Sequence, residues 1–199
     1  MQIEAIGSSG EFRHLSTIAG IAVDLRYATP HNFAGRDLYS PFDCAWLHRE
    51  AAAGLEQVVA WLAAARPGCT ALVLDALRPQ RVQEQLWDTL DGTGLQMYLA
   101  EPARGSIHSF GMALDITLLD ADGNELDMGT GFDDLSERSQ PVLESHFLAR
   151  GELTARQIAN RQLLREAMAQ GGFAGIASEW WHYDCGNRDL VRATYQRIL

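Results

Sequence analysis

Two short stretches of the chain combine the residue types of a metal-dependent hydrolase. The first reads SIHSFGMALD and carries His108 and Asp115; the second reads EWWH and carries Glu179 and His182. Two imidazole nitrogens and one carboxylate oxygen leave the fourth position of a tetrahedral zinc site open for water. A further carboxylate beside that water can accept its proton. The residues therefore predict a zinc hydrolase in which His108, Asp115 and His182 bind Zn²⁺ and Glu179 stays free.

The first motif needs a bend in the chain to bring its two ligands together. Residues from Gly111 to Leu119 alternate between large apolar side chains and a second face that carries Asp115, as in a β-strand. His108 lies seven residues before Asp115, too far away to share a helical turn with it. We therefore expect a loop that holds His108 and pivots at Gly111 into the strand.

The second motif poses a geometric problem for a regular strand. Residues three apart in a strand face opposite sides, yet the aromatic residues of EWWHY favour a strand. We expect either a bulge or a strand that begins after Glu179, so that Glu179 and His182 converge on one metal-bound water. Taken alone, each motif also fits a simpler interpretation, with Trp180 and Trp181 as core aromatics and their polar neighbours in solvent. The two motifs together favour the metal site.

Periodicity along the chain predicts the elements that carry these residues. We expect helices over residues 46–66, 79–90 and 154–171, the last opened by a capping box, and strands over residues 71–77, 111–119, 125–128 and 174–184. This order predicts an α+β fold in one domain, residues 1–199, with a mainly antiparallel central sheet flanked by helices and the zinc site on the sheet.

Composition limits the classes of partner and the location of the protein. The 16 basic and 26 acidic residues give a net charge of −10, which disfavours binding to nucleic acid or anionic lipid. No apolar run is long enough to span a bilayer, and the N-terminal residues lack a signal-peptide pattern. The 3 cysteines are widely spaced, so we expect free thiols and a cytoplasmic location. The oligomeric state is not predicted.

The motifs resemble those of a known family. SIHSFGMALD matches the S-x-H-x-x-G-x-A-x-D signature, and EWWH the E-x-x-H signature, of the zinc D,D-peptidases, with the greatest similarity to the D-alanyl-D-alanine dipeptidases of the vancomycin-resistance type. Further blocks follow in the family order: DLRYAT at 24–29, DALRP at 75–79 and GFD at 131–133. The resemblance covers residues 23–183, most of the chain.

The resemblance implies a role for each candidate site residue. It implies one zinc ion per chain, with the ligands His108, Asp115 and His182. Glu179 would be the general base, and Arg78 would steady the developing oxyanion. Three positions match residues that line the dipeptide pocket: Ser106, Tyr27 and Asp133. Of these, Asp133 would pair with the substrate ammonium. Ala76 and Leu77 stand where the family often has Gly-Tyr, a change that can reshape the pocket wall.

The implied function is hydrolysis of D-Ala-D-Ala to two D-alanines, in cell-wall recycling or glycopeptide resistance, with a small dipeptide as substrate. The acidic segment 120–150 is a candidate lid that excludes longer peptides. Two alternatives remain open: a D,D-carboxypeptidase or another dipeptidase on the same fold, and a zinc-binding domain without catalytic activity. The presence of Glu179 and Arg78 disfavours the second, because a binding module needs neither.

Overall fold

The computed structural model describes residues 1–199 and has a five-stranded mixed sheet at its centre, in the strand order β2-β4-β5-β7-β6. The strands of this sheet are β2 (Ile21–Val23), β4 (Thr70–Asp75), β5 (Ala113–Leu119), β6 (Phe173–Gly175) and β7 (His182–Cys185). A second, two-stranded sheet pairs β1 (Phe12–His14) with β3 (Trp46–His48).

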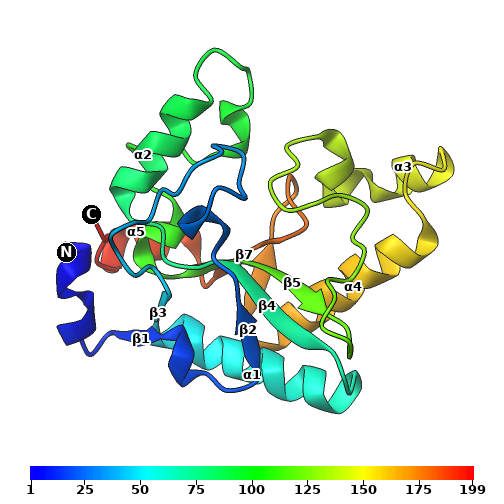
Figure 1. Ribbon diagram of the computed structural model, residues 1–199, viewed down its shortest axis with the longest axis horizontal. Helices are drawn as coiled ribbons and strands as arrows, with labels where there is room; N and C mark the ends of the chain where they lie inside the picture. The colour runs from blue at the N-terminus through cyan, green and yellow to red at the C-terminus, as the bar shows by residue number, and fades with distance from the viewer.

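Five α-helices surround the central sheet: α1 (Arg49–Ala65), α2 (Gln80–Thr89), α3 (Glu144–Ala149), α4 (Ala155–Gln170) and α5 (Arg188–Thr194). Figure 1 shows α1 and α4 along one side of the sheet, with α2, α3 and the long connections on the other. The two termini lie together, since the Met1 ammonium donates to the Arg197 carbonyl at 2.7 Å. None of the helices combines the length and apolar composition needed to cross a membrane.

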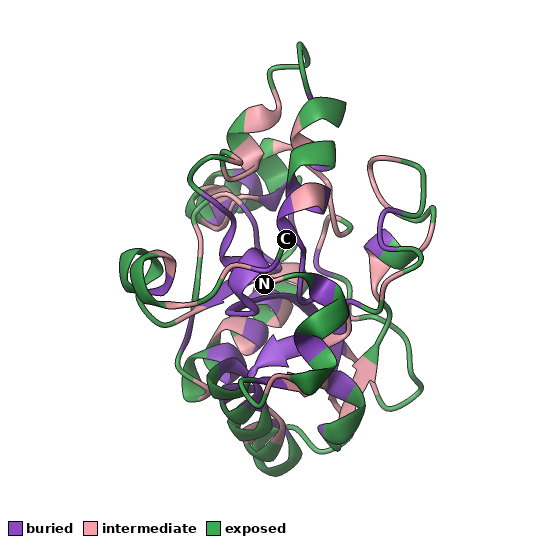
Figure 2. Ribbon diagram, turned by 90° about the vertical axis from the view of Figure 1, so that its left-hand side faces the viewer, coloured by how far each residue is buried: buried purple, intermediate pink, exposed green.

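The main hydrophobic core fills the space between the sheet and its helices. Leu55 and Val58 of α1 and Leu164 of α4 belong to the same buried cluster as Leu114 and Ile116 of β5. Figure 2 shows the buried residues gathered along the sheet and the elements packed on it. Burial on this scale is the main stabilising contribution to a fold of this size. It holds the strands of the sheet, and the polar residues on them, in fixed relative positions.

The predicted α+β fold is confirmed, as is the mainly antiparallel sheet. Three strand pairings of the central sheet are antiparallel, β4 with β5, β5 with β7 and β6 with β7, and only β2 pairs with β4 in parallel. The capping box of α4 is also present, with the Thr154 side chain accepting from Gln157 and the Gln157 side chain from Thr154.

Two predicted strands are wrong. Residues 125–128 form no strand, because their pairing with β5 is limited to a single bridge between Leu119 and Glu125. The predicted strand over 174–184 is two strands, β6 and β7, separated by an irregular stretch. Trp180 and Trp181 in that stretch lie outside both strands and are buried in the core, and the Trp181 carbonyl accepts a hydrogen bond from the Ile116 N–H of β5 at 3.0 Å.

Candidate active site

A row of polar side chains crosses three strands of the central sheet. Asp115 of β5 pairs directly with His182 of β7 on one side and with Asp75 of β4 on the other. The register of β4 against β5 shifts between Val73 and Asp75, an irregularity that brings Asp75 opposite Asp115. Because directly paired residues of antiparallel strands share a face, the three side chains lie side by side.

His108 reaches this row from a short 3-10 helix, Ile107–Phe110, that precedes β5. The Ser106 hydroxyl caps this helix by accepting from the His108 backbone N–H at 3.3 Å. Gly111 ends it in the left-handed conformation, with φ of 65°. A Cβ atom at this position would lie 2.8 Å from the His48 backbone nitrogen, so the bend requires glycine. The predicted pivot at Gly111 is therefore present.

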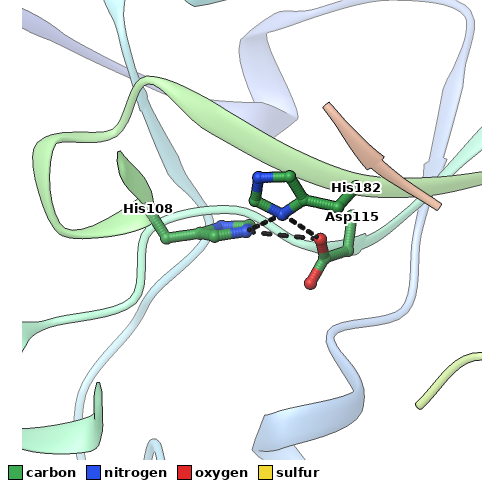
Figure 3. Close-up of side chains that lie close together, drawn as sticks. All are labelled: His108, Asp115 and His182. Carbon is green, nitrogen blue, oxygen red and sulfur yellow. Dashed lines mark hydrogen bonds and ion pairs between the residues drawn. The ribbon is translucent and has the colours of Figure 1, made fainter. Parts of the chain in front are cut away.

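Three donor atoms converge from these elements. Nε2 of His108 lies 3.1 Å from Nδ1 of His182 and 3.3 Å from Oδ1 of Asp115, and the last two atoms are 3.0 Å apart. Figure 3 shows the three side chains pointing toward one another. Ligands held at about 2.0–2.1 Å around a tetrahedral metal lie about 3.3 Å from each other. The predicted ligand set can therefore hold one metal ion with little movement.

The outer nitrogens of both imidazoles have acceptors that set the ring tautomers. Nδ1 of His108 lies 2.7 Å from the Ala76 carbonyl, and Nε2 of His182 lies 2.9 Å from Oδ1 of Asp184. Both partners are acceptors, so these nitrogens carry hydrogen and donate. With a metal bound, both rings would be neutral and would direct the lone pairs of His108 Nε2 and His182 Nδ1 at the shared centre, as metal-binding histidines do.

The electrostatics of the cluster suit a cation. Burial would lower the pKa of His182, but the carboxylates of Asp184 and Asp115 outweigh it and raise the pKa to about 10. Burial would raise the pKa of Asp115, yet His108 and His182 hold it well below its usual range. Burial has the same upward effect on Asp184, which His182 and Arg188 reverse to give a pKa of about 2. The site thus keeps two carboxylates ionised beside the imidazoles.

Glu179 precedes β7, which begins at His182, so the second of the two predicted geometries is the one observed. The Glu179 side chain lines the same cavity as the three donor residues and is buried, with 8% of the residue exposed. This burial raises the pKa of Glu179 to about 7, against the attraction of His182. A carboxylate with such a pKa can both accept and return a proton near neutral pH.

Arg78 lies directly beside the donor cluster. Its Nη2 donates to Oδ2 of Asp115 at 3.1 Å and to Oδ2 of Asp75 at 2.7 Å, and its Nη1 donates to Gln83. The guanidinium also stacks over the Tyr27 ring, 4.9 Å from its centroid. Asp75 is fully buried and accepts a further hydrogen bond from the Tyr39 hydroxyl. Asp75 therefore fixes Arg78 in one orientation.

All the predicted site residues line one cavity of about 50 Å³: Tyr27, Arg78, Ser106, His108, Asp115, Asp133, Glu179 and His182. Phe33, Leu135 and residues 98–100 complete its wall. The Tyr27 hydroxyl donates to Oδ1 of Asp133 at 3.0 Å, whereas Oδ2 is shielded from solvent and has no hydrogen-bond partner. Burial and the nearby Asp115 charge raise the pKa of Asp133 well above its usual range. An ammonium group placed there would satisfy this oxygen.

A model of the D-Ala-D-Ala dipeptidase family matches residues 9–198 of the chain. The chain belongs to this family. The D-alanyl-D-alanine dipeptidase of Escherichia coli strain K12 is 38% identical over 164 residues, 82% of this chain and 78% of the relative. That of Enterococcus faecium is 32% identical over 190 residues, 83% of this chain and 86% of the relative. A solved structure of the LdcB LD-carboxypeptidase aligns with 93% of this chain and 72% of its own at a TM-score of 0.48 and 15% identity, too distant to inform the site.

Membership in the dipeptidase family makes the chain a peptidase, and the interpretation as a binding domain without catalytic activity loses its support. Ala76 and Leu77, which stand where the family often has Gly-Tyr, are buried and do not line the cavity. Ala76 contributes its backbone carbonyl, which any residue supplies.

Sequence reasoning missed two residues of this dipeptidase site, Asp75 and Asp184. The sequence contains a feature that could have indicated each of them. Asp75 interrupts an apolar run that forms a buried strand, where an acidic residue needs a buried partner. Asp184 follows His182 by two residues, so strand periodicity places both on the same face of β7.

Proposed function

We propose that this enzyme hydrolyses free D-Ala-D-Ala to two D-alanines, using one zinc ion bound by His108, Asp115 and His182. The observation that carries the proposal is the tetrahedral spacing of three donor atoms, 3.0–3.3 Å apart, beside a buried carboxylate and a buried arginine. The names of the relatives, all D-alanyl-D-alanine dipeptidases, support the choice of substrate.

Besides the metal, three residues of the chain have separate roles in the reaction. Zinc held by His108, Asp115 and His182 would supply Lewis acidity, which would lower the pKa of a water molecule to about 7 and polarise the substrate carbonyl. Glu179 accepts a proton from the attacking water and returns it to the leaving amine as the C–N bond breaks. Arg78 offers guanidinium N–H donors to the carbonyl oxygen as it gains negative charge. Asp75 keeps that guanidinium in place.

The two ends of the dipeptide have separate binding groups. Asp133, with its unpartnered Oδ2, accepts the substrate ammonium, and the Tyr27 hydroxyl holds the other carboxylate oxygen. Ser106 lies on the same wall as His108 and offers a hydroxyl to the substrate carboxylate. An opening of about 360 Å³ adjoins the cavity, sharing Phe33 and Asp133 with it. We propose this opening as the substrate entrance.

The cavity favours a small substrate. A volume of about 50 Å³ leaves no room for an extended peptide. Asp133 and Leu135, which line the cavity, belong to the segment 120–150. We therefore propose that this segment forms the lid that excludes longer peptides. A longer peptide would meet further clashes and would lack the free ammonium next to the scissile bond.

Comparison of two substrates tests this function. We expect the zinc-loaded enzyme to hydrolyse D-Ala-D-Ala with a kcat/KM at least about a hundredfold above that for a pentapeptide ending in D-Ala-D-Ala, because only the dipeptide places an ammonium beside Asp133. Release of free D-alanine measures both reactions. Preference for the pentapeptide would make the protein a D,D-carboxypeptidase, the alternative on the same fold.

Asp184 should control metal affinity without touching substrate. The Asp184→Asn variant loses the charged acceptor that orients the His182 ring, so we expect zinc affinity to fall about 10–100-fold. Competition with a chromogenic chelator measures this affinity. Asp189→Asn is the matched control, because Asp189 is an exposed carboxylate on the adjacent helix. Equal zinc affinity in both variants would show that Asp184 does not orient the ligand.

We also propose that residues 1–199 act as one domain in the cytoplasm. All three cysteines are free thiols in the structure, and the family match extends over nearly the whole length described.

A further inference from the structure

A buried arginine on α4 holds both ends of the segment that carries Asp133. Nε of Arg161 donates to the Met128 carbonyl at 2.7 Å, and Nη2 donates to the Arg138 carbonyl at 3.0 Å. The same Nη2 lies 3.4 Å from the Thr130 hydroxyl. Arg161 is completely buried, and Figure 1 shows the yellow-green segment between β5 and α3 lying beside α4. The backbone on either side of Asp133 is therefore tied to one rigid helix.

The Thr130 hydroxyl connects this segment to the residue after Glu179. It accepts a hydrogen bond from Nε1 of Trp180 at 2.9 Å and lies 2.8 Å from the Ser139 hydroxyl. The Arg161 guanidinium lies 5.9 Å from the centroid of the Trp180 ring. Thr130 and Arg161 thus contact both the segment around Asp133 and the segment that carries Glu179.

The backbone at Asp133 requires such support. Asp133 is the one residue other than glycine with positive φ, at 60°. Residues with a Cβ atom rarely adopt this left-handed conformation, although aspartate does so more often than most. Strained backbone of this kind persists where the surrounding structure enforces it, and often at functional sites. The hydrogen bonds to residues 128, 130 and 138 are in the right place to enforce it.

Arg161 shares a single carboxylate, that of Glu144, with Arg165. Nη1 lies 3.5 Å from Oε1 of Glu144, and Arg165 holds both oxygens of Glu144 at 2.8 and 3.0 Å. A buried ion pair adds little net stability compared with apolar packing of the same volume. Arginine suits this position because its planar guanidinium holds several N–H donors in a fixed geometry and can bind several acceptors at once.

We propose that Arg161 and Thr130 are positioning residues that set the distance between Asp133 and Glu179 and so restrict the enzyme to dipeptides. The inference rests on the proposed function, in which Asp133 binds the ammonium and Glu179 acts at the scissile bond. In a dipeptide one residue separates the ammonium from that bond. A fixed spacing of the two carboxylates selects this length, and a looser spacing admits longer peptides.

The Thr130→Val variant tests the proposal, because it removes the hydroxyl and preserves shape and charge. We expect KM for D-Ala-D-Ala to rise about five- to tenfold, as for one lost hydrogen bond, with kcat within about threefold of wild type. The rate on D-Ala-D-Ala-D-Ala relative to the dipeptide should increase by a similar factor. Arg161→Lys keeps the charge but loses the fork and should have the larger effect. D-Alanine release measures each rate, and zinc content and thermal unfolding verify the fold.

Matched controls are Thr89→Val and Arg156→Lys, since both residues are exposed and line neither the cavity nor its entrance. Unchanged KM and unchanged substrate preference in folded, zinc-loaded Thr130→Val would overturn the proposal, as would an equal loss of kcat on all substrates. If Arg161→Lys does not fold, the KM and substrate preference of Thr130→Val alone test the proposal. A wild-type enzyme that does not hydrolyse D-Ala-D-Ala would overturn the proposed function itself, and the restriction to dipeptides with it.

Discussion

Replacing Glu179 with glutamine should lower kcat for D-Ala-D-Ala by about 10²–10⁴-fold, the usual contribution of a general acid–base residue. The amide keeps the size and the hydrogen-bonding capacity of the side chain, but it cannot accept the proton of the attacking water. The donor atoms of the metal site belong to other residues, so zinc content should stay at one ion per chain. Rate measurement together with metal analysis of the same preparation gives both quantities.

Glu166→Gln is the control for the Glu179 variant, because Glu166 is an exposed carboxylate on α4 outside the cavity. It should retain wild-type kcat. A Glu179→Gln enzyme with full zinc content and near-normal turnover would exclude Glu179 as the base. Asp133 would then be the carboxylate to test, since it is the other acidic residue of the cavity wall outside the donor cluster.

Arg78→Lys should lower kcat by about 10²–10³-fold, the loss observed when one donor to an oxyanion is removed. Lysine keeps a positive charge next to Asp75 and Asp115, which avoids the cost of leaving buried carboxylates without a partner. It cannot reproduce the planar guanidinium that contacts both carboxylates and Gln83. Because the interaction forms in the transition state, KM for the dipeptide should change little.

A phosphinate analogue of the dipeptide distinguishes this role of Arg78 from a purely structural one. Its tetrahedral anion resembles the transition state, so its affinity should fall by about the same factor as kcat/KM. If Arg78 only stabilises Asp75, the thermal unfolding temperature would fall while phosphinate affinity, measured on folded protein, stays unchanged. That second pattern would remove Arg78 from the chemistry.

Local motifs predicted which side chains come together, because His108, Asp115, Glu179 and His182 stand in two short, informative patterns. The spacing of His108 and Asp115 around Gly111 already implied a turn followed by a strand, which is the observed geometry. The position of Glu179 ahead of its strand is one of the two geometries predicted from the conflict between a three-residue spacing and the two-residue period of a strand. The structure adds the cross-strand pairing of Asp115 with His182, which is a long-range contact.

Other features depend on contacts that no local pattern encodes. Strands β1 and β2 have three residues each, too few to show alternation. The alignment of Asp75 with Asp115 arises from a register shift in β4, which becomes visible only once the strands are paired. The left-handed Asp133 and its anchoring by Arg161 likewise require the packing of α4 against a distant segment. Most of the features that the sequence did not predict therefore depend on tertiary contacts.

The metal coordination of the purified enzyme is the most direct test of the site. X-ray absorption at the zinc edge, combined with metal analysis, should show one zinc per chain bound by two imidazole nitrogens and carboxylate or water oxygens at about 2.0–2.2 Å. Substituting alanine for His108, Asp115 or His182 should each remove most of the metal, whereas alanine at the distant His146 should not. A protein that binds no divalent metal, or one whose zinc shows sulfur ligands at about 2.3 Å and persists in all three variants, would contradict the assignment of these side chains as the metal site.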